Sequence, residues 1–136
     1  MFQSALTFFV LARSNLAKYI SGWVQLNYPT KMGTLEEQLS FIRKKGLKLP
    51  TTLNGRAIPE EVELNSFECW IVRQWQDIGT SRINTDAGPQ SISDTQILSY
   101  MQLMEEDLRL VDITLIKDTD RAFINELAVQ RELNKE

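Results

Sequence analysis

The amino-acid sequence predicts an all-α fold, a compact bundle of about five helices joined by loops that contain glycine and proline. Three observations support this prediction. Apolar residues recur at spacings of three and four, which places them on one face of a helix. The six glycines and four prolines fall between these periodic segments, where they interrupt helices. The alternation of apolar and polar residues that is typical of strands is weak throughout.

Length and composition limit the classes of function. The chain has 136 residues, the size of one domain, and its 43% hydrophobic and 24% charged residues are ordinary for a globular protein. It contains no histidine and one cysteine, Cys69, which excludes histidine-dependent catalysis, histidine metal sites, intrachain disulfides and multi-cysteine metal cages. We expect Cys69 to be a buried or half-buried, unreactive thiol, because Glu68 beside it opposes thiolate formation.

Charge is distributed unevenly along the chain. Residues 1–58 carry eight basic and two acidic side chains, a net charge of +6, whereas the remainder carries −9. The two halves either neutralise each other within one fold or favour self-association or an oppositely charged partner. The basic run at 43–48 contains no aromatic residue, and the chain is acidic overall, so we expect no nucleic-acid partner.

The first helix is predicted from about Gln3 to Ser21. Its apolar stripe, in which Arg13 fills one position, consists of Phe2, Leu6, Phe9, Leu16, Ile20 and Trp23. We expect this stripe to pack on its own domain, with docking to another copy or a partner as the alternative. The apolar run is too short to span a bilayer and lacks the features of a secretory signal, so a cytoplasmic protein is expected.

The second helix is predicted to begin at Thr34, which forms a capping box with Glu37. Its buried stripe is Leu35, Leu39 and Ile42. Met32 precedes this cap as a plausible start of translation. Residues 1–31 are therefore predicted to be an amphipathic helical extension of a helical domain that comprises residues 32–136.

Two further helices flank a polar loop at 80–91. One is predicted from Pro59 to Gly79, because proline suits the first helical turn and glutamates follow it. Its apolar face is Leu64, Phe67, Ile71, Trp75 and Ile78, with Trp70 on its flank. The next helix begins at Ser93, with Gln96 completing a capping box. It carries Ile97, Met101, Met104 and Leu108 on one face, with Tyr100 beside them.

The last helix is predicted from Asp112 to about Leu133, and its apolar stripe is Ile113, Ile116, Phe123 and Leu127. Asp120 falls inside this stripe. Because an unpaired buried carboxylate is costly, Asp120 must be paired, capped or exposed at an edge.

No arrangement of catalytic residues is evident. The glycines are too scattered for a phosphate-binding loop, and Asp118-Thr119-Asp120 is followed by arginine instead of the glycine pattern of a calcium loop. Glu105-Glu106-Asp107 is typical of a solvated helix end. We therefore expect no enzymatic activity, no metal and no cofactor.

Short motifs follow one another in the second half of the chain: WQDIGTSR at 75–82, GPQSI at 88–92, Ile97 with Tyr100, and IKDTDRAF at 116–123. Together with TLEEQL at 34–39, their order and spacing resemble the small tail assembly chaperones of long-tailed (siphovirus-type) bacteriophages. The resemblance covers residues 32–130. Residues 1–31 depart from it, as does the Glu105-Glu106-Asp107 segment, where members of the family often have a turn that contains glycine.

The resemblance implies a non-enzymatic protein of the host cytoplasm that is absent from the mature virion. Such chaperones bind the long, helical tape measure protein and help to recruit tail tube subunits around it. We expect adaptable apolar side chains to bind this client. The candidates are Trp70, Trp75, Tyr100, Met101 and Met104. The segregated charge suits a homo-oligomer in which copies stack head to tail along the client.

Arg82 and Asp120 occupy matched motif positions. We therefore predict an ion pair between them that ties the loop to the last helix, with Arg73 as the alternative cation.

Three other functions are kept as alternatives. The first is a virion structural protein, such as a head–tail connector or minor tail protein. The second is a small helical DNA-binding regulator, which the acidic second half disfavours. The third is a peripheral membrane protein that uses the first helix, which has few basic residues on its polar face.

Overall fold

The structure is a computed structural model that describes residues 4–53 and 55–135. Within these ranges it has five helices: α1 (Ala5–Asn27), α2 (Leu35–Lys44), α3 (Ser66–Gly79), α4 (Asp94–Leu103) and α5 (Leu110–Leu133). Two short antiparallel hairpins join them. In the first, β1 (Thr52–Leu53) pairs with β2 (Arg56–Ala57), and in the second β3 (Asn84–Thr85) pairs with β4 (Gly88–Pro89). The predicted all-α fold is confirmed.

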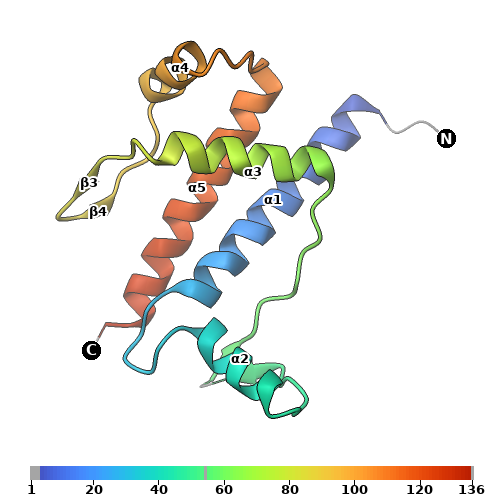
Figure 1. The fold of residues 1–136 in the computed structure, drawn as a ribbon, viewed down its shortest axis with the longest axis vertical. Helices are drawn as coiled ribbons and strands as arrows, with labels where there is room; N and C mark the ends of the chain where they lie inside the picture. The colour runs from blue at the N-terminus through green and yellow to red at the C-terminus, as the bar shows by residue number, and fades with distance from the viewer. Residues whose placement is uncertain (1–3, 54, 136) are drawn as a thin grey trace.

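The two long helices α1 and α5 lie side by side and run in the same direction, and α3 crosses them (Figure 1). An ion pair joins α1 to α5, with Arg13 Nε 2.9 Å from Asp118 Oδ2. Helix α4 lies at one end of the long axis, and α2 with the β1–β2 hairpin lies at the other. None of the described helices is long and apolar enough to cross a membrane.

One hydrophobic core joins α1, α3, α4 and α5. It contains Ala12, Leu16, Ile20, Ile71, Val72, Trp75, Ile78, Ile92, Ile97, Leu108, Leu115 and Ile116. Burying each large aliphatic side chain stabilises the fold by about 1.5–3 kcal/mol relative to exposure. Helix α1 supplies three of these positions, so the segment predicted to be an N-terminal extension, residues 1–31, contributes to the same core as the rest of the chain.

Helix α1 continues to Asn27, past the end predicted at Ser21. The prediction took Gly22 as a helix end, but Gly22 is buried inside the helix. A Cβ at this position would lie 3.3 Å from Cβ of Pro59, so the glycine allows the chain after β2 to approach the helix closely.

The predicted stripe of α1 is only partly correct. Leu16 and Ile20 are buried, but Leu6 is 72% exposed and Trp23 is 45% exposed. Phe2 and Gln3 lie outside the described residues.

Helix α3 begins at Ser66, so the start predicted at Pro59 is wrong. The true cap is Asn65, whose Oδ1 accepts a 2.8 Å hydrogen bond from Glu68 N, while Glu68 Oε1 accepts a 3.0 Å bond from Asn65 N. This reciprocal capping box satisfies two backbone donors at once, which a first-turn proline does not do. Residues 58–65 have no helical or strand structure and lead the chain from the β1–β2 end to α3.

The N-caps at Thr34 and Ser93 are confirmed: the two hydroxyls accept 3.1 Å bonds from Glu37 N and Gln96 N. The capping box is complete only at Ser93, whose N–H donates a 2.8 Å bond to Gln96 Oε1; the box predicted at Thr34 lacks the reciprocal bond to Glu37. Helix α4 ends at Leu103, so Leu108, although buried, follows the helix instead of belonging to its face. Helix α5 begins at Leu110, two residues before the predicted start.

Glu105 follows the end of α4 with a φ of +53°, in the left-handed region that favours glycine. Glu106 N donates a 3.0 Å hydrogen bond to the Met101 carbonyl, which is the bond that closes a helix through a left-handed residue. The turn after α4 therefore closes through a left-handed residue that is not glycine.

We expect Glu105→Gly to raise the free energy of unfolding by about 1 kcal/mol, because glycine adopts this φ without steric penalty. Urea unfolding of the two proteins measures the difference. Asp107→Gly, at an exposed position in the same turn that is not left-handed, is the matched control and should not stabilise. Equal stability of Glu105→Gly and the unmodified chain would contradict the prediction.

Candidate functional site

A buried carboxylate joins three segments of the chain. Asp120 in α5 is 3% exposed and accepts hydrogen bonds from three donors. These are Trp75 Nε1 at 3.0 Å, Arg82 Nη2 at 2.5 Å and the backbone N–H of Ile92 at 2.9 Å. The ion pair predicted between Arg82 and Asp120 is therefore present, and the alternative cation, Arg73, lies exposed on α3.

The same arginine makes two further contacts. Arg82 Nη1 donates a 2.9 Å bond to the Gln90 carbonyl, and its guanidinium lies 5.0 Å from the centre of the Phe123 ring. Phe123 in turn meets Trp75 edge to face at 5.1 Å. The motifs at 75–82, 88–92 and 116–123 thus converge on one buried cluster, which holds the loop between α3 and α4 against α5.

A second arginine, on α5, also contacts the β3–β4 hairpin. Arg131 Nη1, near the end of α5, donates a 3.0 Å hydrogen bond to the Ala87 carbonyl. Gly88 has a φ of +109°, and a Cβ there would overlap the Arg131 guanidinium. The glycine of the GPQSI motif is therefore required for its backbone conformation, whereas the flexible Arg131 side chain could move away from a Cβ.

The predicted binding residues do not form one surface. Trp75 is buried in the core with its indole N–H bound to Asp120, and it contributes to the wall of the hollow described below. Trp70 is half-buried and stacks on Phe67 at 6.1 Å. Tyr100 and Met101 are half-buried against the core, and only Met104 is exposed.

Tyr100 joins α4 to α3 through a 2.6 Å hydrogen bond from its hydroxyl to Gln74 Oε1. The pKa of the Tyr100 hydroxyl is raised above its ordinary value of 10.0, first by burial and then by the negative charges of Asp77 and Glu106. Both causes disfavour the phenolate, so the seam between α3 and α4 is held by a neutral tyrosine.

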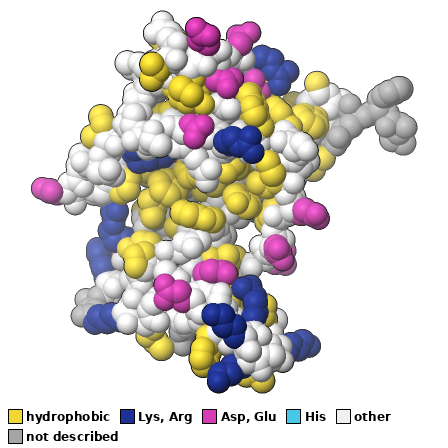
Figure 2. Space-filling view, viewed as in Figure 1, with side chains coloured by type: hydrophobic (Ala, Val, Ile, Leu, Met, Phe, Trp, Pro, Cys, Tyr) yellow, Lys and Arg dark blue, Asp and Glu magenta, His cyan; other side chains and the backbone are white. Residues whose placement is uncertain are grey.

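Aromatic side chains surround a small hollow where α3 crosses α1 and α5, which we call the aromatic hollow. Its volume is about 220 Å³, and it is lined by Tyr19, Ile20, Trp23, Trp75, Gln76, Gly79, Arg82 and Phe123. Figure 2 shows apolar side chains gathered in a band across the middle of the molecule. Tyr19 is not among the predicted binding residues, and Trp23 belongs to them only through the alternative that the stripe of the first helix docks to a partner. Nothing in the linear sequence shows that α3 leaves this part of α1 exposed.

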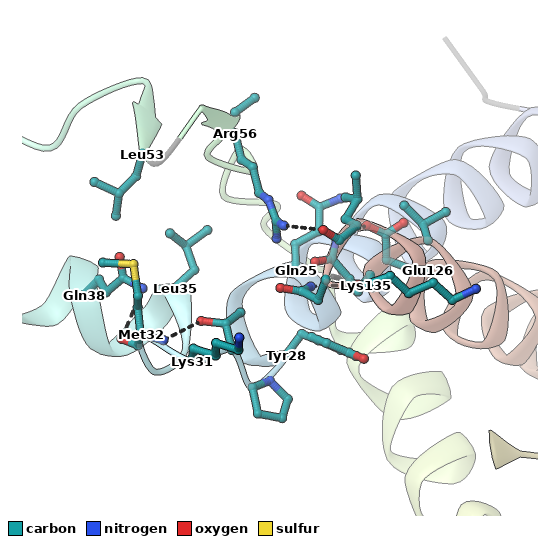
Figure 3. A pocket seen from close by; sticks show the side chains of 17 residues that line it. Gln25, Tyr28, Lys31, Met32, Leu35, Gln38, Leu53, Arg56, Glu126 and Lys135 are labelled. Atoms are coloured by element: carbon teal, nitrogen blue, oxygen red, sulfur yellow. Dashed lines mark hydrogen bonds between the residues drawn. The ribbon is translucent and has the colours of Figure 1, made fainter. Parts of the chain in front are cut away.

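A larger hollow of about 1130 Å³ lies between the end of α1, α2, the β1–β2 hairpin and the end of α5. We call it the basic groove. Leu35 and Leu53 lie on one side, and Glu126 and Lys135 lie on the other (Figure 3). The α5 residues Val129 and Leu133 also line the groove. Its charged lining residues are Lys31, Arg56, Lys135 and Glu126. Arg56 spans from the hairpin to the last helix, donating a 3.2 Å bond to the Leu133 carbonyl.

The opposite end of the molecule carries an apolar and acidic surface, which we call the acidic turn. It consists of the end of α4 and the connection to α5, with Leu103, Met104 and Leu110 exposed beside Glu105, Glu106 and Asp107. Leu103 is 82% exposed. Arg109 adds no free positive charge here, because it is paired with Asp112 at 3.1 Å.

Within residues 4–53 and 55–135, no group of three or more cysteine, aspartate or glutamate side chains is placed to hold a metal ion. Cys69 is exposed, which corrects the expectation of a buried or half-buried thiol: it lies on the outer side of α3, one residue after the buried Glu68. Comparison with family models, with curated proteins and with solved structures finds no match.

Removing the arginine from the buried cluster should destabilise the fold strongly. We expect Arg82→Met to lower the free energy of unfolding by about 3–5 kcal/mol, because Asp120 then keeps a buried charge without its counterion. Arg73→Met, the same substitution at an exposed site, should change it by less than about 0.5 kcal/mol. Urea unfolding measures both. A loss for Arg82→Met no larger than that for Arg73→Met would show that the pair does not stabilise the fold.

Tyr100 should make stability depend on alkaline pH. Because its pKa is raised in the folded protein, the stabilisation is complete below pH 10 and is lost as the pH rises through the folded pKa. Urea unfolding at about pH 9 and about pH 11 should therefore show a larger loss for the unmodified chain than for Tyr100→Phe. Equal losses in the two proteins would contradict this assignment.

Proposed function

We propose that this chain is a non-enzymatic tail assembly chaperone, which binds the tape measure protein in the host cytoplasm and helps to recruit tail tube subunits around it. The observation that supports client binding is the aromatic hollow, in whose wall Trp23 is 45% exposed. Recruitment of tube subunits, and absence from the mature virion, rest on the resemblance of the motifs.

The chemistry of the hollow suits an apolar side chain projecting from a helix. Tyrosine and tryptophan offer large contact areas with little loss of conformational freedom, and they are enriched among the residues that dominate binding energy. The hollow has only room for one or two side chains, so a helical client would insert an anchor there and extend over the surrounding apolar band. An anchor of this kind recurs easily along a long helical protein.

Many other large apolar side chains are exposed over the molecule, including Leu6 and Ile83. Apolar side chains exposed singly at separate places are ordinary for a globular protein, so these residues do not add support for client binding.

Trp23→Ala should weaken binding of a purified tape measure fragment at least tenfold, because tryptophan in a pocket commonly contributes 2 kcal/mol or more, about a thirtyfold change in Kd. Isothermal titration calorimetry with the fragment measures the dissociation constant. Leu6→Ala removes an exposed apolar side chain from the same helix, outside the hollow, and is the matched control. Since Trp23 is half-exposed, thermal unfolding of both variants checks that the fold is intact.

Unchanged affinity for Trp23→Ala would remove the aromatic hollow as the client site. Failure of the unmodified chain to bind any part of the tape measure protein would remove the function itself. Mass spectrometry of purified particles separates the chaperone from a virion structural protein, because the chaperone should be missing from them.

A further inference from the structure

We propose that the α2 end of this molecule binds the surface of an anionic lipid bilayer, with apolar side chains entering the membrane interface and lysines contacting the headgroups. The binding surface, which we call the basic tip, lies where α2 ends and the chain turns towards β1. It consists of Phe41, Lys44, Lys45, Leu47, Lys48 and Leu49. The inference does not rest on the proposed client, because the basic tip and the aromatic hollow share no residue.

The apolar side chains of the basic tip lie outside the core. Phe41 and Leu47 are 63% and 64% exposed, and Leu49 is 38% exposed. None of the three belongs to the hydrophobic core, lines the aromatic hollow or lines the basic groove. Three large apolar side chains within nine residues of chain therefore remain exposed at the α2 end of the molecule (Figure 1).

Hydrogen bonds define the turn that carries these side chains. Gly46 has a φ of +70°, and its N–H donates a 3.0 Å bond to the Arg43 carbonyl. The N–H of Leu47 donates a 3.3 Å bond to the Ile42 carbonyl. These two bonds form the Schellman motif, which ends a helix through a left-handed residue. The backbone of the basic tip is therefore ordered before any partner binds, which lowers the entropic cost of binding.

The charge of the basic tip has one sign. From residue 38 to residue 59 the sequence has five basic residues and no acidic residue. Lys44 and Lys48 form no ion pair with any residue that the structure describes. The ammonium of Lys45 lies 5.4 Å from the centre of the Phe41 ring, so one cation and one apolar ring are presented together.

The acidic residues of α2 compensate this charge only in part. Glu36 and Glu37 lie in the first turn of the helix, whereas Lys44 ends it. Glu36 pairs with Arg43 at 3.2 Å, and neither residue belongs to the basic tip. Glu37 precedes Lys44 by about 10 Å of helix, which is about the distance over which 0.1 M salt screens surface charges. The basic tip therefore keeps a positive potential.

This combination favours a membrane over a polypeptide partner. Proteins at a membrane interface insert aromatic and leucine side chains at the boundary between headgroups and acyl chains, and clustered lysines and arginines attract anionic lipids. Figure 2 shows lysine and arginine side chains around apolar ones at the α2 end. The apolar side chains stand on the end of the molecule and line neither described hollow, so no pocket selects an individual side chain of a partner. A bilayer surface requires no such pocket.

Binding to vesicles should depend on lipid charge and on salt. The unmodified chain should cosediment with vesicles of phosphatidylglycerol and phosphatidylcholine in equal amounts, but not with vesicles of phosphatidylcholine alone. The bound fraction should fall as salt is raised from 0.1 M to 1 M, because the screening length falls from about 10 Å to about 3 Å.

Two pairs of variants locate the membrane contact. Lys44→Glu should bind anionic vesicles about fivefold more weakly or worse, because each lysine near an anionic surface contributes about this factor. Lys18→Glu, at an exposed lysine on α1, changes the net charge equally and should retain binding. Leu47→Ser should likewise weaken binding about fivefold or more, since it removes an inserted side chain. Leu103→Ser, at the 82% exposed leucine of the acidic turn, should bind as the unmodified chain does.

Insertion of the apolar side chains has its own readout. Phe41→Trp places an indole in the basic tip, and its fluorescence should shift to shorter wavelength with anionic vesicles and be quenched by brominated acyl chains. The three tryptophans of the unmodified chain lie outside the basic tip and give the background signal.

Circular dichroism confirms that each variant is folded before it is mixed with vesicles. The proposal is overturned if the unmodified chain does not bind anionic vesicles, or if Lys44→Glu or Leu47→Ser binds as tightly as its control. It is also overturned if the indole of Phe41→Trp is not quenched. A chain that ignores the vesicles but binds polyglutamate would show that the partner of the basic tip is an acidic polypeptide, and the membrane proposal would be wrong.

Discussion

Among the buried carboxylates of the described residues, Asp120 accepts hydrogen bonds from the most segments of the chain. Asp120 receives one donor from α3, one from the loop after it and one from the chain just before α4, so one side chain positions three segments relative to α5. A charge in this environment is tolerated only when its hydrogen bonds are complete, which makes the arrangement of its donors strict. The loop that carries Arg82 has little apolar surface of its own, and this cluster gives it a defined position.

Much of this arrangement can be predicted from local rules. The caps at Thr34 and Ser93 follow from side chains that satisfy nearby backbone donors, and the need of Asp120 for a cation follows from the cost of burying charge. The start of α3 could have been found by the same rule, since Asn65 and Glu68 have capping-box spacing, but Pro59 offered a competing start. Gly22 could not be interpreted locally, because its reason is the approach of Pro59 from elsewhere in the chain.

The surfaces are less predictable than the core. Helical periodicity identified Trp75 as part of an apolar face, but it does not distinguish a face that is covered from one that is left open. Trp75, on α3, is buried where this helix crosses the two long helices, whereas Trp23, near the end of α1, is 45% exposed. The basic groove likewise combines α1, α2, a hairpin and the end of α5, and these residues share no pattern along the sequence.

The parallel direction of α1 and α5 has an electrostatic consequence for the isolated molecule. Two neighbouring helices that point the same way add their macrodipoles, leaving partial positive charge at both N-termini and partial negative charge at both C-termini. Glu105, Glu106, Asp107 and Asp112 gather near the start of α5, while Lys31, Arg56 and Lys135 gather where α1 and α5 end. The formal charges thus oppose the combined dipole of the helix pair. Their position lowers the electrostatic repulsion between the like ends of the two parallel helices within a single molecule.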